Sequence, residues 1–118
     1  MSGFSFALIM EIVAVHWLAD FCLQTHEQAQ NKSKNTGALF RHCATYTIAL
    51  LLVFGFTGWM AAAWCLLNGA LHFAVDFCTC RITSKLYVEQ RYHDFFATIG
   101  ADQVLHYAAL FGTAGIML

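Results

Sequence analysis

The longest apolar stretch of the chain, residues 43–78, reads CATYTIALLLVFGFTGWMAAAWCLLNGALHFAVDFC. A helix needs about 20 mainly apolar residues to cross the hydrocarbon layer of a membrane, so this stretch is too long for one crossing. Its one turn-like interruption is Gly55-Phe56-Thr57-Gly58, and glycines favour turns. The stretch therefore predicts two membrane-spanning helices that are joined by a tight hairpin.

Two further stretches, residues 4–24 and 95–118, are also long and apolar enough to cross a membrane. Of the 118 residues in the chain, 59% are apolar and 11% are charged, which is beyond what the core of a soluble domain requires. We therefore predict a single domain, residues 1–118, that is an all-α integral membrane bundle of four transmembrane helices. The predicted spans are residues 4–24, 38–56, 59–80 and 95–118. Between the third and fourth spans, basic and apolar residues alternate in residues 81–94, which predicts a short interfacial helix.

The basic residues indicate how this bundle is oriented. They lie in or beside two of the three predicted loops: Lys32, Lys34, Arg41, Arg81, Lys85 and Arg91. The positive-inside rule predicts that both loops are cytoplasmic and both termini non-cytoplasmic, in a multi-pass protein of the cell inner (plasma) membrane. No Lys or Arg precedes the first apolar stretch, so we expect no cleavable signal peptide. A net charge of −1 argues against a nucleic-acid partner and leaves the lipid bilayer as the expected one.

Histidine and aspartate recur at one spacing along the chain. The pairs are His16 with Asp20, His72 with Asp76, and Asp102 with His106, each separated by four residues. On a helix this spacing places both side chains on one face, one turn apart. The second span adds His42 near its cytoplasmic end. The predicted topology brings all seven side chains to one level in the inner half of the membrane.

Such a cluster predicts a metal centre. An ionised aspartate in the middle of a span costs about 2.5 to 3.5 kcal/mol, and a bound cation would reverse the sign of that cost. Four imidazoles and three carboxylates suit one or two ions of Zn²⁺ foremost, or of Mn²⁺ or Fe²⁺, with an aspartate bridging two ions. Two alternatives use the same residues: polar pairs that hold the bundle together without a metal, and a proton or ion pathway.

Other polar residues lie within a turn of this cluster. The amides of Gln24, Asn68 and Gln103 are placed to fix the tautomers of the histidines by hydrogen bonds. Lys32 either determines topology or folds over the site and binds a phosphate. The five cysteines include no Cys-x-x-Cys motif, and we interpret most of them as small apolar residues, with Cys78 and Cys80 as weak candidates for thiolate ligands.

The combined pattern resembles the DUF3307 family of small bacterial and phage membrane proteins. The resemblance rests on His16, Asp20, Phe21, Leu23, Gln24, Asn31, Lys32, Ser33, His42, His72, Phe73, Asp76, Asp102, Gln103 and His106. It implies that Gln24, Lys32 and Gln103 act together with the histidines and aspartates, but it supplies no reaction. In size, helical membrane character and scattered His and Asp, the chain is more loosely similar to the DUF457 group, which is described as membrane-bound metal-dependent hydrolases.

Three functions are compatible with this pattern of residues. The leading hypothesis is a membrane-embedded metal-dependent hydrolase that acts on a lipid headgroup or another phosphate-containing substrate, with Asp20, Asp76 and Lys32 as catalytic residues. The second is an oligomeric channel or transporter for protons or divalent cations, in which Glu11 would extend the polar path outward. The third is a non-catalytic membrane interaction protein with a structural polar core.

Overall fold

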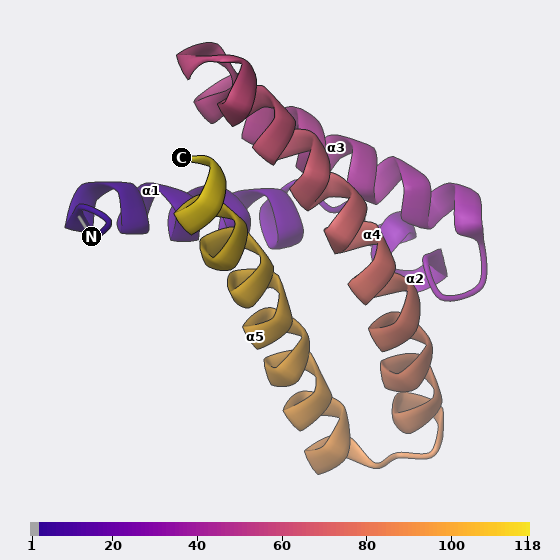
Figure 1. Ribbon diagram of the computed structural model, residues 1–118. Helices are drawn as coiled ribbons and strands as arrows, with labels where there is room; N and C mark the ends of the chain where they lie inside the picture. The colour runs from indigo at the N-terminus through magenta and orange to yellow at the C-terminus, as the bar shows by residue number, and fades with distance from the viewer. Residues whose placement is uncertain (1–2) are drawn as a thin grey trace.

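The computed structural model describes residues 3–118, and every regular element within that range is helical (Figure 1). The prediction of an all-α fold is confirmed. Residues 1 and 2, which belong to the predicted domain, lie outside the described residues. The α-helices are α1 (Phe6–Trp17), α2 (His26–Asn31), α3 (Thr36–Phe54), α4 (Trp59–Val88) and α5 (Tyr92–Met117).

The predicted hairpin between the two most apolar helices is confirmed. Helices α3 and α4 pack against each other and are joined by a 3₁₀ turn, Gly55–Thr57. Gly58 follows with a φ of 145°, a backbone conformation that only glycine adopts without strain. The same two helices approach most closely at Gly69, where the space for a side chain is taken by Thr47.

Replacing Gly69 by alanine is expected to destabilise the α3–α4 pair. An alanine Cβ would lie 2.0 Å from Thr47 Oγ1, and Thr47 is held in place because its hydroxyl donates to the Cys43 carbonyl oxygen (2.8 Å). Overpacking of this kind costs about 1 to 3 kcal/mol. Thermal unfolding of the detergent-solubilised protein, followed by circular dichroism, measures the loss. Gly112→Ala is the matched control because a Cβ there meets nothing within 4 Å. Equal unfolding midpoints for the two variants would contradict the prediction.

The predicted interfacial helix in residues 81–94 is wrong. Helix α4 continues without a break through Val88, because neither glycine nor proline lies between Gly69 and Val88. It ends where Gln90 takes a φ of 59°. The Arg91 amide then donates to the Leu86 carbonyl oxygen and the Gln90 amide to that of Tyr87, which is the Schellman arrangement of a helix end. Helix α5 begins directly afterwards.

Two helical segments are long and apolar enough to span a membrane, Thr36–Thr57 and Trp59–Val88. The four predicted spans are therefore not all reproduced. The α-helix of the predicted first span ends at Trp17, and α1 runs across the other helices in Figure 1. Helix α5 has the required length, but polar residues such as Asp102 and His106 lower its hydropathy.

The apolar core fills the part of the bundle towards the α3–α4 turn. It contains Trp64 and Cys65 from α4, Leu50 and Phe54 from α3, Ile12 from α1, and Leu110 and Ala114 from α5. The Trp64 indole N–H donates to the Leu110 carbonyl oxygen at 3.2 Å, so its polar atom is satisfied inside this core. The buried polar residues form a separate layer, farther from the turn.

Candidate metal centre

The structure brings the seven histidines and aspartates of the sequence pattern into one buried cluster. They come from α1 and the turn after it, from α3, from α4 and from α5, and each is at most 8% exposed. The members are His16, Asp20, His42, His72, Asp76, Asp102 and His106. The convergence expected from the spacing is therefore present in the fold, and the burial makes every polar contact within it energetically significant.

Asp20 lies in a short π-helical turn, Leu18–Cys22, that follows α1 directly. Its closing hydrogen bond runs from the Leu23 amide to the Leu18 carbonyl oxygen at 2.9 Å. Such wide turns recur at functional sites, because one inserted residue redirects the side chains around it. Sequence analysis did not anticipate this turn, since no residue type marks it.

Four donor atoms surround one point between α1, α3 and α4. His42 Nε2 lies 3.1 Å from both His72 Nε2 and Asp20 Oδ1, and the last two atoms are 3.4 Å apart. Asp76 Oδ2 is 3.6 Å from His42 Nε2 and 3.9 Å from His72 Nε2. In a tetrahedral zinc site with bonds of about 2.0 to 2.1 Å, the ligand atoms lie about 3.3 Å from one another. The donor atoms of Asp20, His42 and His72 therefore have nearly the separation of three ligands of a tetrahedral cation, and Asp76 adjoins the two histidines.

A second set of donors adjoins the first. Asp20, Asp102 and His106 each offer an atom within 4.8 Å of the others, and His106 Nε2 is 3.0 Å from Asp102 Oδ2. Because Asp20 belongs to both sets, its two carboxylate oxygens can bridge two cations. A further grouping joins Cys43 with His72 and Asp76. Cys43, which lies next to His42 in the chain, was not predicted to be a ligand because it belongs to no motif.

Asp102 is held by two neighbours. The Thr79 hydroxyl donates to Asp102 Oδ1, and the Gln103 amide donates to Asp102 Oδ2 at 3.2 Å. The same amide also donates to Asp20 Oδ2 at 3.1 Å. Thr79 was missed in the sequence, although it follows Asp76 by three residues and so shares its helix face.

His16, which the spacing predicts to be a ligand, forms hydrogen bonds through both ring nitrogens. Its Nε2 lies 2.8 Å from Gln103 Oε1, which can only accept, so this nitrogen carries the proton. Its Nδ1 accepts from the Tyr46 hydroxyl at 2.8 Å, and the Tyr46 ring stacks on His72 at a centroid distance of 3.9 Å. Both nitrogens of His16 are thus engaged, and the residue fixes the amide that joins Asp20 to Asp102.

Hydrogen bonding within the cluster is incomplete. Within residues 3–118, four buried side-chain atoms have no hydrogen-bond partner: His42 Nδ1, His72 Nδ1, His106 Nε2 and Gln24 Oε1. An unsatisfied buried polar atom costs about 1 to 3 kcal/mol. Two of these atoms, His42 Nδ1 and His72 Nδ1, are the ring nitrogens opposite to the Nε2 atoms that face one another and Asp20.

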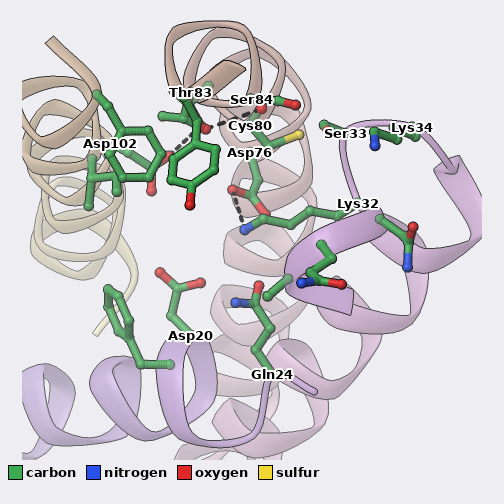
Figure 2. A pocket seen from close by; sticks show the side chains of 18 of the residues that line it. Asp20, Gln24, Lys32, Ser33, Lys34, Asp76, Cys80, Thr83, Ser84 and Asp102 are labelled. Atoms are coloured by element: carbon green, nitrogen blue, oxygen red, sulfur yellow. Dashed lines mark hydrogen bonds and ion pairs between the residues drawn. The ribbon is translucent and has the colours of Figure 1, made fainter. Parts of the chain in front are cut away.

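Lys32 reaches the cluster from the loop side. It caps the C-terminus of α2, and its Nζ donates to both carboxylate oxygens of Asp76 at 3.0 and 3.2 Å (Figure 2). Burial alone would lower the pKa of Lys32, but the Asp76 carboxylate outweighs burial and raises that pKa above its ordinary value. The ammonium group is therefore charged. Two roles were expected for Lys32, as a determinant of topology or as a phosphate-binding residue folded over the site. Its contact with Asp76 supports the role at the site.

A cavity of about 720 Å³ opens beside the acidic residues. Asp20, Asp76 and Asp102 lie at its inner end, and Gln24 and Gln103 also line it (Figure 2). Cys80 lines the cavity, whereas the Cys78 side chain is exposed elsewhere, and all five cysteine thiols are free.

Asn68 does not belong to the cluster, contrary to expectation. Its amide donates to the Trp64 carbonyl oxygen at 3.0 Å and to Thr113 Oγ1 at 2.9 Å. Both partners lie on the side of the apolar core, because Asn68 is one helical turn nearer the α3–α4 hairpin than His72. Its role is to pair α4 with α5.

Comparison with known proteins agrees with the first of the two sequence resemblances. The model of a family described as a protein of unknown function, DUF3307, matches residues 8–115. No curated protein and no solved structure matches the chain. The looser similarity to the DUF457 group is not shown by these comparisons. The match covers all seven cluster residues together with Gln24, Lys32 and Gln103, and the chain belongs to the DUF3307 family.

Proposed function

We propose that this protein is a membrane-embedded, metal-dependent hydrolase that acts on a phosphate-containing group at the cytoplasmic side of the membrane. The observation that carries the proposal is the set of three donor atoms from Asp20, His42 and His72, 3.1 to 3.4 Å from one another, with Asp76 beside the two histidines and a cavity that Lys32 lines. A bound divalent cation would supply a Lewis acid for a phosphoryl oxygen and would lower the pKa of an attacking water.

The residues of the chain divide the remaining tasks among themselves. Asp20 and Asp76 hold the positive charge at the inner end of the cavity. The charged Lys32 lies between this end and the outer part of the cavity, where it can orient an anionic group as a point charge. His106, whose Nε2 lies 3.0 Å from Asp102 Oδ2, would hold a second cation together with Asp102 and Asp20.

The depth of the cluster along α4 supports a substrate at the membrane surface. At 1.5 Å per residue, α4 extends about 44 Å from Trp59 to Val88, which matches a bilayer with its headgroup regions. Asp76 lies about 26 Å from Trp59 on the same scale. With the proposed four-span topology, Asp76 would fall at the inner boundary of the hydrocarbon layer, Arg81 and Lys85 would lie beyond it among the headgroups, and both termini would be on the opposite side.

A channel is less well supported by the same arrangement. Between the cluster and the α3–α4 turn the bundle is filled mainly by apolar side chains, including Trp64, Leu50 and Phe54. Glu11, which a channel would need as the next polar step, is exposed on α1. The cavity instead ends at the acidic residues, as expected for a site that binds and releases its substrate on one side.

Two measurements test the proposal in order. The purified protein, supplied with Zn²⁺, Mn²⁺ or Fe²⁺ and then desalted, is expected to retain one or two equivalents of an ion, measured by mass spectrometry of the elements. Retention is expected to fall by about one equivalent in His42→Ala and His72→Ala, because a ligand is lost from the buried site that these two histidines share. His93→Ala is the control, since this histidine is exposed on α5.

The second measurement follows phosphate release from phosphate-bearing lipids and from soluble phosphomonoesters. The metal-loaded protein is expected to release phosphate, whereas the His42→Ala and His72→Ala variants are expected to release none. A folded protein that retains no transition metal would refute the metal centre. Retained metal without release from any of these substrates would refute the hydrolase.

A further inference from the structure

The cavity has two chemically different walls. One carries positive charge and hydroxyl groups at Lys32, Ser33, Lys34 and Ser84. The other is built from the last turn of α4 and the first turns of α5, and it is apolar: Tyr87, Val88, Phe95 and Ile99. A site for a small polar phosphate needs only the first wall. The second exposes apolar surface inside a cavity whose inner end is acidic.

The polar wall continues outward into a basic depression. A second hollow of about 330 Å³ shares Ser33, Lys34, Ser84 and Val88 with the cavity and adds Arg81, Lys85 and Glu89, so three basic residues and one acidic residue line it. Arg81 is pinned to its own helix, because it donates to the Phe77 carbonyl oxygen and lies over the Phe77 ring. Within residues 3–118, Lys34 forms no ion pair, so its charge is available to an anion at the mouth of the cavity.

The apolar wall is held together by its own aromatic contacts. The ring centroids of Phe95 and Tyr87 are 5.4 Å apart, and those of Tyr87 and Tyr92 are 5.8 Å apart across the turn between α4 and α5. Phe95 and Ile99 are half-buried and line the cavity, whereas Phe96 and Val104 on the same helix are 67% and 66% exposed and do not line it. Two faces of α5 are therefore apolar, and only one of them belongs to the cavity.

We infer that the cavity binds a phosphate-bearing amphiphile, with its phosphate between Lys32 and Lys34 and the first part of its hydrocarbon chain against Tyr87, Phe95 and Ile99. Charge complementarity selects the phosphate, and the apolar wall selects the chain. Both contacts are available at once only at the boundary between headgroups and hydrocarbon. The inference rests on the proposed function, because it names the class of substrate for the same site.

Binding to the protein in nanodiscs of zwitterionic lipid tests this inference without requiring turnover. The probes are inorganic phosphate and alkyl phosphates of increasing chain length, followed by ³¹P NMR titration. We expect affinity to increase by about tenfold or more from inorganic phosphate to octyl phosphate, because each buried methylene adds to binding. Phe95→Ser and Ile99→Gln are expected to abolish most of this increase without changing the affinity for inorganic phosphate. Phe96→Ser and Val104→Gln are the matched controls and are expected to keep the increase in affinity with chain length.

The outcomes separate the inference from the proposed function. Equal affinity for inorganic and octyl phosphate, or an equal loss in Phe95→Ser and Phe96→Ser, would overturn the amphiphile. Because the chain-length comparison is made on the unmodified protein, it holds even if a variant does not fold. Chain-dependent binding by a protein that retains no metal would support the amphiphile and refute only the hydrolase. Metal-dependent hydrolysis with no effect of chain length would support the hydrolase and refute only the amphiphile.

Discussion

Asp20→Asn is expected to remove all bound metal from the protein, whereas Asp102→Ala is expected to remove one ion of two. Asp20 contributes to both donor sets, since its carboxylate lies beside His42 and His72 on one side and beside Asp102 and His106 on the other. An amide has nearly the shape of the carboxylate but lacks its charge, so the cavity keeps its form while the bridge is lost.

The loss of activity should be correspondingly large. We expect phosphate release in Asp20→Asn to fall by at least about a thousandfold, because a bound cation supplies several kcal/mol and about 1.4 kcal/mol is a factor of ten. Metal content and initial rates measured on the same preparations check both parts. Glu11→Gln is the control, because that carboxylate is exposed on α1. Metal retained at the unmodified level in Asp20→Asn would show that Asp20 is not a ligand.

Lys32→Met is expected to separate metal binding from substrate binding. In the absence of a cation, Lys32 Nζ neutralises Asp76 through two hydrogen bonds and so competes with a metal for that carboxylate. Removing the ammonium group should therefore raise metal affinity by about tenfold, as expected for the loss of one charged hydrogen bond of about 1.5 to 3 kcal/mol. The same variant should bind phosphate-bearing substrate less tightly and show a higher KM.

This opposite pair of effects distinguishes the two roles of the lysine. Metal titration and KM are measured together in Lys32→Met and in Arg41→Met. Arg41 pairs only with Glu27 on the exposed surface at 3.5 Å and should leave both quantities unchanged. A fall in metal affinity in Lys32→Met would show that the lysine supports the donor set rather than competing with the cation.

Much of the cluster follows from the sequence because helix geometry is local. A separation of four residues places His72 and Asp76 on one face whatever the rest of the chain does. Gly55 and Gly58 fix the hairpin, which sets α3 and α4 antiparallel and brings His42 to the level of that pair. Together with the four-span topology predicted from the basic residues, these local facts led to the prediction that the histidines and aspartates converge.

The roles of individual atoms do not follow from spacing. His16 and His72 have the same relation to an aspartate four residues later, yet His16 bonds to Tyr46 and Gln103 while His72 Nε2 faces His42. The difference arises from how α1 crosses the bundle and from the stacking of Tyr46 on His72. Such contacts depend on packing between helices, which no spacing within one helix specifies.

The sequence by itself determined that the chain is helical, where its hairpin lies and which residues share a helix face, because turn residues and helical periodicity act over only a few residues. Only the tertiary structure decided that α4 continues through Val88, that a π-helical turn presents Asp20, and that the donor atoms of Asp20, His42 and His72 lie 3.1 to 3.4 Å from one another. The physical reason is that ligand distances are set by the approach of separate helices, as where Gly69 meets Thr47, and these approaches are fixed by close packing of the whole bundle.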